Sequence, residues 1–150
     1  NVHRAPTNCG PTTSGIRNLE DWLGDEKWDL VHFNFGLHDL KFIKDGKLDS
    51  TGTVVHHLDQ YTANIKKILK IVAPRTDLMI FATTTPVAPN TEGFFPQQPI
   101  EYNAAAVRIM KENGVIINDL HAALSPDLEK YQLPQNVHSK NPATYSCPKK

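Results

Sequence analysis

Residues 29–40 read Asp29-Leu-Val-His-Phe-Asn-Phe-Gly-Leu-His-Asp-Leu40, and this stretch decides the fold class. The apolar run before Gly36 predicts a buried strand, and the glycine permits a sharp turn directly after it. Two titratable residues, His38 and Asp39, follow at once. Ligands of open α/β sheets bind just past the carboxyl ends of the strands. The stretch therefore places polar chemistry where such folds keep their sites.

Strand and helix patterns alternate along the chain on either side of this stretch. Short apolar runs predict strands at 2–4, 29–35, 78–82 and 115–117. Apolar residues at helical spacing predict helices at 16–23, 56–73 and 101–113, and Ser-Pro-Asp at 125–127 predicts another helix start. Residues 41–55 and 86–99 are expected to be irregular. This alternation predicts an α/β fold with a parallel sheet, right-handed crossovers and helices on both faces.

Composition narrows the class of protein and its partners. The chain has 150 residues, enough for one domain with a core. Lys+Arg and Asp+Glu are 16 each, and this balance argues against nucleic acid or an anionic membrane as the main partner. No apolar run approaches the roughly 18 residues of a membrane span. Cys9 and Cys147 could form a disulfide, but two cysteines define no framework.

Three polar segments are candidates for carrying chemistry. Gly10, in Asn8-Cys-Gly-Pro-Thr12, could present an unpaired N–H that stabilises an oxyanion. His38 could donate a hydrogen bond into the same hole, and His138 could act as general base for a serine. Each has a structural alternative: an ordinary loop glycine, a histidine bonded to loop carbonyls, and a solvated histidine near a terminus.

No metal site is predicted. His56, His57 and Asp59 begin a predicted helix, and no third ligand has matching spacing, so a solvated helix end is favoured. Asp119, after the strand at 115–117, is expected to cap a helix or form a turn.

These residues, in this order, resemble the SGNH (GDSL-type) hydrolases, in particular a subset of bacterial and metagenomic esterases. The landmarks are GPTT, KWDLVHFNFGLHDLK, ATTTPV, a YN-x-AA helix start, MKENGV-IINDL and LPQ-x-VH. The resemblance implies a three-layer α/β/α, flavodoxin-like fold and ester hydrolysis through a serine, with no metal or organic cofactor. The implied substrates are small-molecule or carbohydrate esters with short acyl groups. The resemblance also favours an extracytoplasmic or secreted location.

The resemblance assigns roles residue by residue. Gly10 matches an oxyanion donor of the family's second block. His38 stands where the third block, Gly-x-Asn-Asp, has an asparagine donor, and an imidazole can also supply an N–H. His138 matches the catalytic histidine. Substrate contacts are expected from Asn8, Asp39 and Thr85.

The chain departs from the family pattern in two ways. The block that carries Gly-Asp-Ser and the nucleophile should precede Val2, and the family's last helix has no counterpart. Residues 1–150 are therefore expected to form one domain, incomplete at both ends. The acidic residue before the histidine corresponds to Gln135 or Asn136, and neither carries a negative charge. Weak candidates for the nucleophile are Ser14, Ser139 and Cys9, although Ser14 is expected to cap the following helix.

The sequence leaves three interpretations open. The first is an esterase acting on short-chain acyl esters. The second is a catalytically impaired fragment or pseudoenzyme that retains a groove for acylated glycans. The third is structural, because a sheet that lacks its central strand exposes edges through which copies of the chain could form a homo-oligomer.

Overall fold

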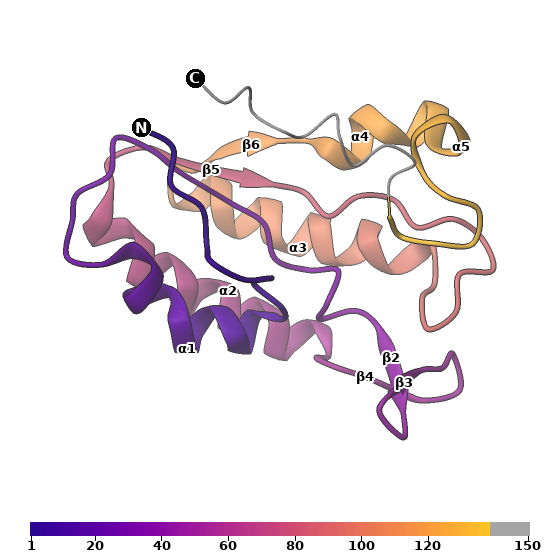
Figure 1. Ribbon diagram of the computed structural model, residues 1–150. Helices are drawn as coiled ribbons and strands as arrows, with labels where there is room; N and C mark the ends of the chain where they lie inside the picture. Colours follow the sequence, from indigo (N-terminus) through magenta and orange to yellow (C-terminus); the bar gives the residue numbers. More distant parts are fainter. Residues whose placement is uncertain (139–150) are drawn as a thin grey trace.

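A three-stranded parallel sheet forms the centre of this computed structural model, which describes residues 1–138. Its strands, in spatial order, are β1 (Val31–Phe33), β5 (Met79–Ala82) and β6 (Ile116–Asn118) (Figure 1). Phe33 pairs with Phe81, and Phe81 with Ile117, so these three side chains share one face of the sheet. The predicted α/β class and parallel sheet are confirmed.

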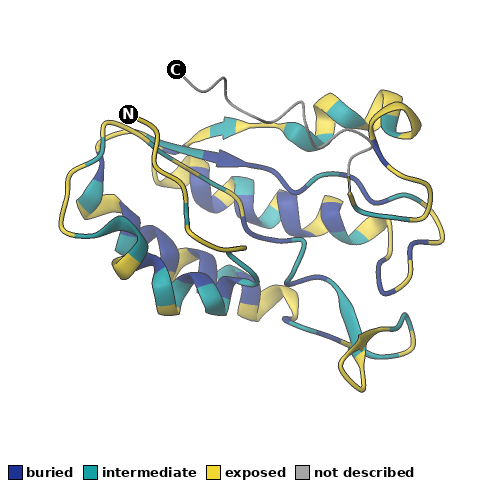
Figure 2. Ribbon diagram, in the orientation of Figure 1, coloured by how far each residue is buried: buried dark blue, intermediate teal, exposed yellow. Residues whose placement is uncertain are grey.

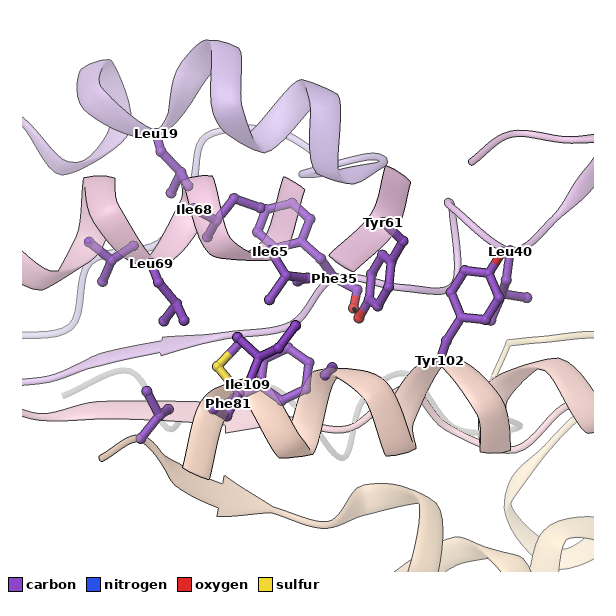
Figure 3. Close-up of a cluster of buried hydrophobic side chains, with 14 of the residues drawn as sticks. Leu19, Phe35, Leu40, Tyr61, Ile65, Ile68, Leu69, Phe81, Tyr102 and Ile109 are labelled. Atoms are coloured by element: carbon purple, nitrogen blue, oxygen red, sulfur yellow. Dashed lines mark hydrogen bonds between the residues drawn. The ribbon is translucent and has the colours of Figure 1, made fainter. Parts of the chain in front are cut away.

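Three long helices pack side by side on that face. They are α1 (Thr12–Leu23), α2 (Leu58–Val72) and α3 (Gln97–Glu112). The middle helix, α2, contacts both others and buries Tyr61, Ile65 and Ile68 among them (Figure 3). Buried residues follow the inward faces of the helices (Figure 2). The apolar stripe read from the sequence of α2 is therefore the side of the helix that meets the core.

Right-handed crossovers explain why α2 and α3 share a face. The chain passes from β1 through α2 to β5, and from β5 through α3 to β6, so both steps run the same way across the sheet. Two right-handed crossovers in the same direction pass over the same face. Among residues 1–138, no crossover runs in the opposite direction across the sheet. No long helix in this part of the chain covers the other face of the sheet. Large apolar side chains remain 41%, 39% and 51% exposed at Leu30, Leu78 and Ile116.

The segment expected to be irregular at 41–55 forms a second, antiparallel sheet. Its strands are β2 (Phe42–Lys44), β3 (Lys47–Leu48) and β4 (Thr53–Val54), in the order β3-β2-β4. Asp45 and Gly46 connect β2 to β3 with φ values of 50° and 76°. Both residues of a tight hairpin turn need positive φ, and Asp-Gly supplies it. The irregular prediction is wrong here because the short hairpin lacks the alternation of a longer strand.

The strand predicted at residues 2–4 is also wrong. The chain is extended but unpaired there, and Val2 is 87% exposed. A strand exists only through its ladder of hydrogen bonds, and β1 pairs with β5 alone within the described residues. The other edge of β1 is open, so edge-to-edge pairing between copies stays a prediction.

The remaining elements follow the strands. They are η1 (Ala73–Arg75), α4 (Leu120–Leu124), η2 (Ser125–Asp127) and α5 (Leu128–Tyr131). Asp119 caps α4 as predicted, because its Oδ1 accepts the Ala122 N–H at 3.0 Å. Ser14 lies inside the first turn of α1, whose N-cap is Pro11, so the expected serine cap is wrong. Ser125 starts a 3-10 turn without a side-chain cap. Within residues 1–138, no helix is both long enough and apolar enough to span a bilayer.

Candidate active site

The turn that carries His38 directly follows β1 and is closed by its own backbone. The Asp39 and Leu40 N–H groups both donate to the Gly36 carbonyl, at 2.8 and 3.0 Å. A side chain at Gly36 would overlap the Thr84 hydroxyl at the end of β5, so glycine is required by close approach. The turn therefore lies at the carboxyl ends of β1 and β5, as the sequence predicts.

Asp39 joins this turn to the start of α1. Its side chain is 0% exposed. The carboxylate accepts the Thr12 N–H at 3.0 and 3.1 Å, and the Thr12 hydroxyl donates to Oδ1 at 2.5 Å. Helix N-termini favour negative charge at such a position. Asp39 was expected to contact substrate, but its burial and internal hydrogen bonds leave it no free surface.

His56 is the second partner of Asp39, and the expectation of a solvated helix end is wrong for it. Its Nδ1 lies 2.6 Å from Asp39 Oδ1, and its backbone N–H donates to the Asp39 carbonyl at 2.9 Å. An ionised carboxylate only accepts, so Nδ1 carries the proton. His57, the neighbouring histidine, is exposed at the N-cap of α2 as expected. No group of metal-ligating side chains occurs among residues 1–138.

The ring of His38, in the same turn, is half-buried. Burial lowers its pKa, and the positive charges of Lys41 and His138 lower the pKa further, while Asp39 opposes them. Lys41 Nζ lies 3.4 Å from Nδ1. An ammonium group can only donate, so Nδ1 accepts and the ring proton resides on Nε2. His38 is therefore a neutral imidazole whose N–H donor is Nε2.

His138 is exposed, and Asn136 orients it. Asn136 Oδ1 lies 2.6 Å from His138 Nδ1 and accepts the His138 backbone N–H at 3.0 Å. Because the backbone N–H can only donate, the shared atom is the amide oxygen, and Nδ1 must also be a donor. When the His138 ring is neutral, Nε2 is therefore the nitrogen with a free lone pair. The charge of a protonated His138 is the smallest of the influences that lower the pKa of His38.

Gly10 does not present a free N–H in this structure. It has a φ of 65° and donates to Asn8 Oδ1 at 2.9 Å, within the same loop. The expectation of an unpaired N–H is therefore not met. Gly10 is nevertheless near the His38 turn, because Asp39 binds Thr12, which follows it by one proline. Asn8 itself is exposed.

The predicted nucleophiles are not joined to the histidines. Within residues 1–138, no serine or cysteine is hydrogen-bonded to His38 or His138. Burial raises the pKa of the half-buried Cys9 thiol, and this disfavours the reactive thiolate. Ser14 packs against Gly10 and receives a hydrogen bond from Asn18 Nδ2 at 3.4 Å. Ser139, like Cys147, lies outside the described residues, so the Cys9–Cys147 pairing stays a prediction.

Thr85 follows β5 at the same edge as the His38 turn. Its side chain is half-buried, and its hydroxyl makes no hydrogen bond within the described part of the chain. Its neighbour Thr84 is fixed by Asn103, which accepts the Thr84 N–H and donates to the Thr84 carbonyl, both at 2.8 Å. Thr85 therefore stays a candidate substrate contact.

Sequence reasoning missed the internal half of the site, formed by Thr12, His56 and Asn64. Asn64 Nδ2 donates to the Thr12 hydroxyl at 2.9 Å. Asn64 falls on the buried side of α2, one position before Ile65, so the helical stripe could have indicated its burial. His56 precedes the helix, and no periodicity extends to it.

Esterases and lipases of known structure share this fold. An alpha/beta hydrolase enzyme from the metagenome of Lake Arreo, Spain, matches 87% of the chain with a TM-score of 0.69 and 15% sequence identity. An acetylxylan esterase from Geobacillus stearothermophilus matches 87% with a TM-score of 0.67 and 19% identity. A GDSL-like lipase from Bacteroides thetaiotaomicron matches 87% with a TM-score of 0.66 and 17% identity.

These likenesses establish the fold. The α/β fold implied by the resemblance to the SGNH (GDSL-type) hydrolases is therefore confirmed over most of the chain. The expected helices on both faces are not found within residues 1–138, where the three long helices share one face of the sheet. The chain spans 61% of the length of the first two structures and 63% of the third. No family model and no curated protein matches the sequence.

Proposed function

We propose that this chain carries the site of a carboxylic-ester hydrolase that acts on short-chain acyl esters, including acetyl groups on carbohydrates. The observation that carries the proposal is the complementary pair His38 and His138. The His38 ring presents an N–H just after β1, and the His138 ring, when neutral, presents a bare nitrogen that Asn136 orients. Acyl transfer needs a donor for the oxyanion and a base for the nucleophile.

The reaction divides between these side chains. His138 Nε2 takes the proton of the attacking hydroxyl or thiol, whose oxygen or sulfur forms a bond to the acyl carbon. His38 Nε2–H donates to the carbonyl oxygen as it becomes negative, and Gly10 joins when its N–H exchanges Asn8 for that oxygen. His138 then returns the proton to the departing alcohol, and water repeats the sequence to release the acid. Thr85 contacts the bound ester.

The attacking group is assigned by mutation. Ser14, Ser139 and Cys9 remain alternatives, and Ser14→Ala, Ser139→Ala and Cys9→Ala test them one at a time. Removing the true nucleophile eliminates a burst of p-nitrophenol in single-turnover hydrolysis of p-nitrophenyl acetate, because the acyl-enzyme no longer forms. If the burst survives all three substitutions, the nucleophile is none of these residues.

The base is tested by His138→Ala with the same ester. General base catalysis contributes on the order of 10²-fold or more, so kcat/KM should fall by about that factor. His57→Ala is the matched control, because His57 is an exposed histidine outside the site. Activity that survives in His138→Ala, or falls equally in His57→Ala, contradicts the proposal.

A second candidate is a non-catalytic module that binds acylated glycans. It is favoured by the Gly10 N–H, which is occupied by Asn8, and by the lack of a serine or cysteine on His138 within residues 1–138. Titration with an acetylated xylo-oligosaccharide, followed through the NMR signals of the His38 ring, separates the two functions. Saturable shifts without turnover above the His138→Ala background favour binding alone.

A further inference from the structure

Asp39 collects hydrogen bonds from elements far apart in the sequence. Thr12 donates to it from α1, and His56 donates to it from the segment before α2. Both partners of Asp39 accept further hydrogen bonds. Asn64 of α2 donates to the Thr12 hydroxyl, and Tyr102 of α3 donates to the His56 carbonyl at 2.6 Å. All three long helices are thus tied to one buried carboxylate.

The backbone on either side of His38 is held at several points. The Tyr61 hydroxyl donates to the Phe35 carbonyl at 2.8 Å, just before the turn. The Asp39 carbonyl accepts the His56 N–H, just after His38. Leu40, the next residue, is fully buried and belongs to the same hydrophobic cluster as Tyr102 (Figure 3). The His38 ring is therefore attached to backbone that is anchored on both sides.

His56 is the group in this arrangement that reaches Asp39 by both side chain and backbone. Its side chain is nearly buried and supplies a charge-assisted hydrogen bond to a carboxylate that has no access to water. A buried carboxylate without such partners would be strongly disfavoured. Without the His56 donor, the Asp39 side chain would gain by turning toward solvent, and that movement would carry His38 with it.

We infer that His56 is a positioning residue, which acts through Asp39 to hold in place the turn that carries His38. This inference rests on the proposed function, in which His38 and Gly10 bind the same oxyanion. The role of His56 is exerted at the turn, since it contacts neither His38 nor His138 through a hydrogen bond within the described residues.

The test compares His56→Leu, His56→Asn and the control His57→Leu. Leucine removes the donor, whereas the amide N–H of asparagine can occupy the place of Nδ1. The first readout is the pKa of the His38 ring, followed by NMR in each full-length variant. His56→Leu should raise this pKa toward its ordinary value, because a released ring becomes more hydrated. His56→Asn should restore much of the lowered value, and His57→Leu should not change it.

The second readout is turnover of p-nitrophenyl acetate. A misplaced oxyanion donor acts on the chemical step, so His56→Leu should lower kcat on the order of a hundredfold with little change in KM. His56→Asn should recover most of kcat. If His56→Leu does not fold, Tyr102→Phe, which removes the hydroxyl that holds the His56 carbonyl, should shift the His38 pKa in the same direction by less.

The two readouts separate the inference from the proposed function. A folded His56→Leu variant with an unchanged His38 pKa and unchanged kcat overturns the inference, and leaves the esterase proposal standing. A parent protein without turnover above that of His138→Ala overturns the esterase proposal, and a His38 pKa that still responds to His56 shows that the turn is held as inferred. Equal losses in His56→Leu and His56→Asn also contradict the role assigned to the donor.

Discussion

Two histidines, His56 and His138, each hold a side-chain oxygen 2.6 Å from Nδ1, but in opposite surroundings. His56 faces the buried carboxylate of Asp39, and His138 faces the amide of Asn136 at the surface. A hydrogen bond to a buried carboxylate is costly to remove, because the carboxylate that remains has no water to solvate it. An exposed neutral pair costs little to break but still fixes which ring nitrogen is free. The same geometry therefore joins elements of the fold at His56, whereas at His138 it fixes which ring nitrogen can accept a proton.

The largest effect is expected from Asp39→Asn, which tests whether the His56 side of this comparison stabilises the fold. The variant removes the buried charge, and it replaces Oδ2, which accepts the Thr12 N–H at 3.1 Å, by an NH₂ group that can only donate. The free energy of unfolding should fall by about 1.5–3 kcal/mol, the contribution of a hydrogen bond to a charged group, measured by urea denaturation with circular dichroism. Asp45→Asn is the control, because Asp45 is exposed and Asn tolerates its φ of 50°. A loss in Asp39→Asn no larger than that of the control would contradict the structural role.

Asn136→Asp tests the role of the contact between Asn136 and His138. A carboxylate beside Nδ1 stabilises the imidazolium of His138, which forms as the base takes its proton. Hydrolysis of p-nitrophenyl acetate should rise about tenfold at the pH plateau, the equivalent of one pKa unit. Because the carboxylate favours protonated His138, the acidic limb of the pH–rate profile should move to higher pH.

Asn136→Ala is the partner experiment for this change. It leaves Nδ1 without an acceptor and should lower the rate, since the free nitrogen is no longer fixed. Equal rates in the parent, Asn136→Asp and Asn136→Ala would show that Asn136 does not orient a base.

The smallest expected effect is a change in the pKa of His38. Lys41→Met removes a positive charge that lowers the His38 pKa, so this pKa should rise, as measured by NMR. In the parent the folded-state pKa lies below the unfolded value. The stability linked to His38 is therefore present above the ordinary histidine pKa and is lost as pH falls through the folded value. Lys41→Met should lose less stability over that acidic range. Lys44→Met is the control, and an equal shift of the His38 pKa in both variants would assign the effect to net charge.

Long apolar patterns predicted most of the fold. The run before Gly36 and the stripe through Tyr61, Ile65 and Ile68 both correspond to elements of the structure. Such patterns are reliable because burial acts on every turn of a helix and every second residue of a strand. The strand at residues 2–4 had no such support, since a strand also needs a neighbour that a short run cannot reveal.

The same distinction applies to the site: some of its residues follow from a sequence pattern, and others are recognised only from contacts in the structure. The position of His38 just after a strand was predicted from the sequence, whereas the role of His138 came from the resemblance and stays a prediction. The partners of Asp39 were not predicted, because Thr12 and His56 are distant in the chain and lie in no repeating pattern. Asp45-Gly46 is a local exception, since a two-residue hairpin signal was present there and indicates β2 and β3.

The hydrogen bonds to Asp39 also affect how tightly an ester could bind. Ordering a residue of flexible backbone costs about 1–2 kcal/mol at room temperature. The segment from Phe35 to Leu40 is already fixed without any ligand, by bonds that a ligand neither makes nor breaks. Folding itself meets that entropic cost, so an incoming acyl group would find its donor preorganised.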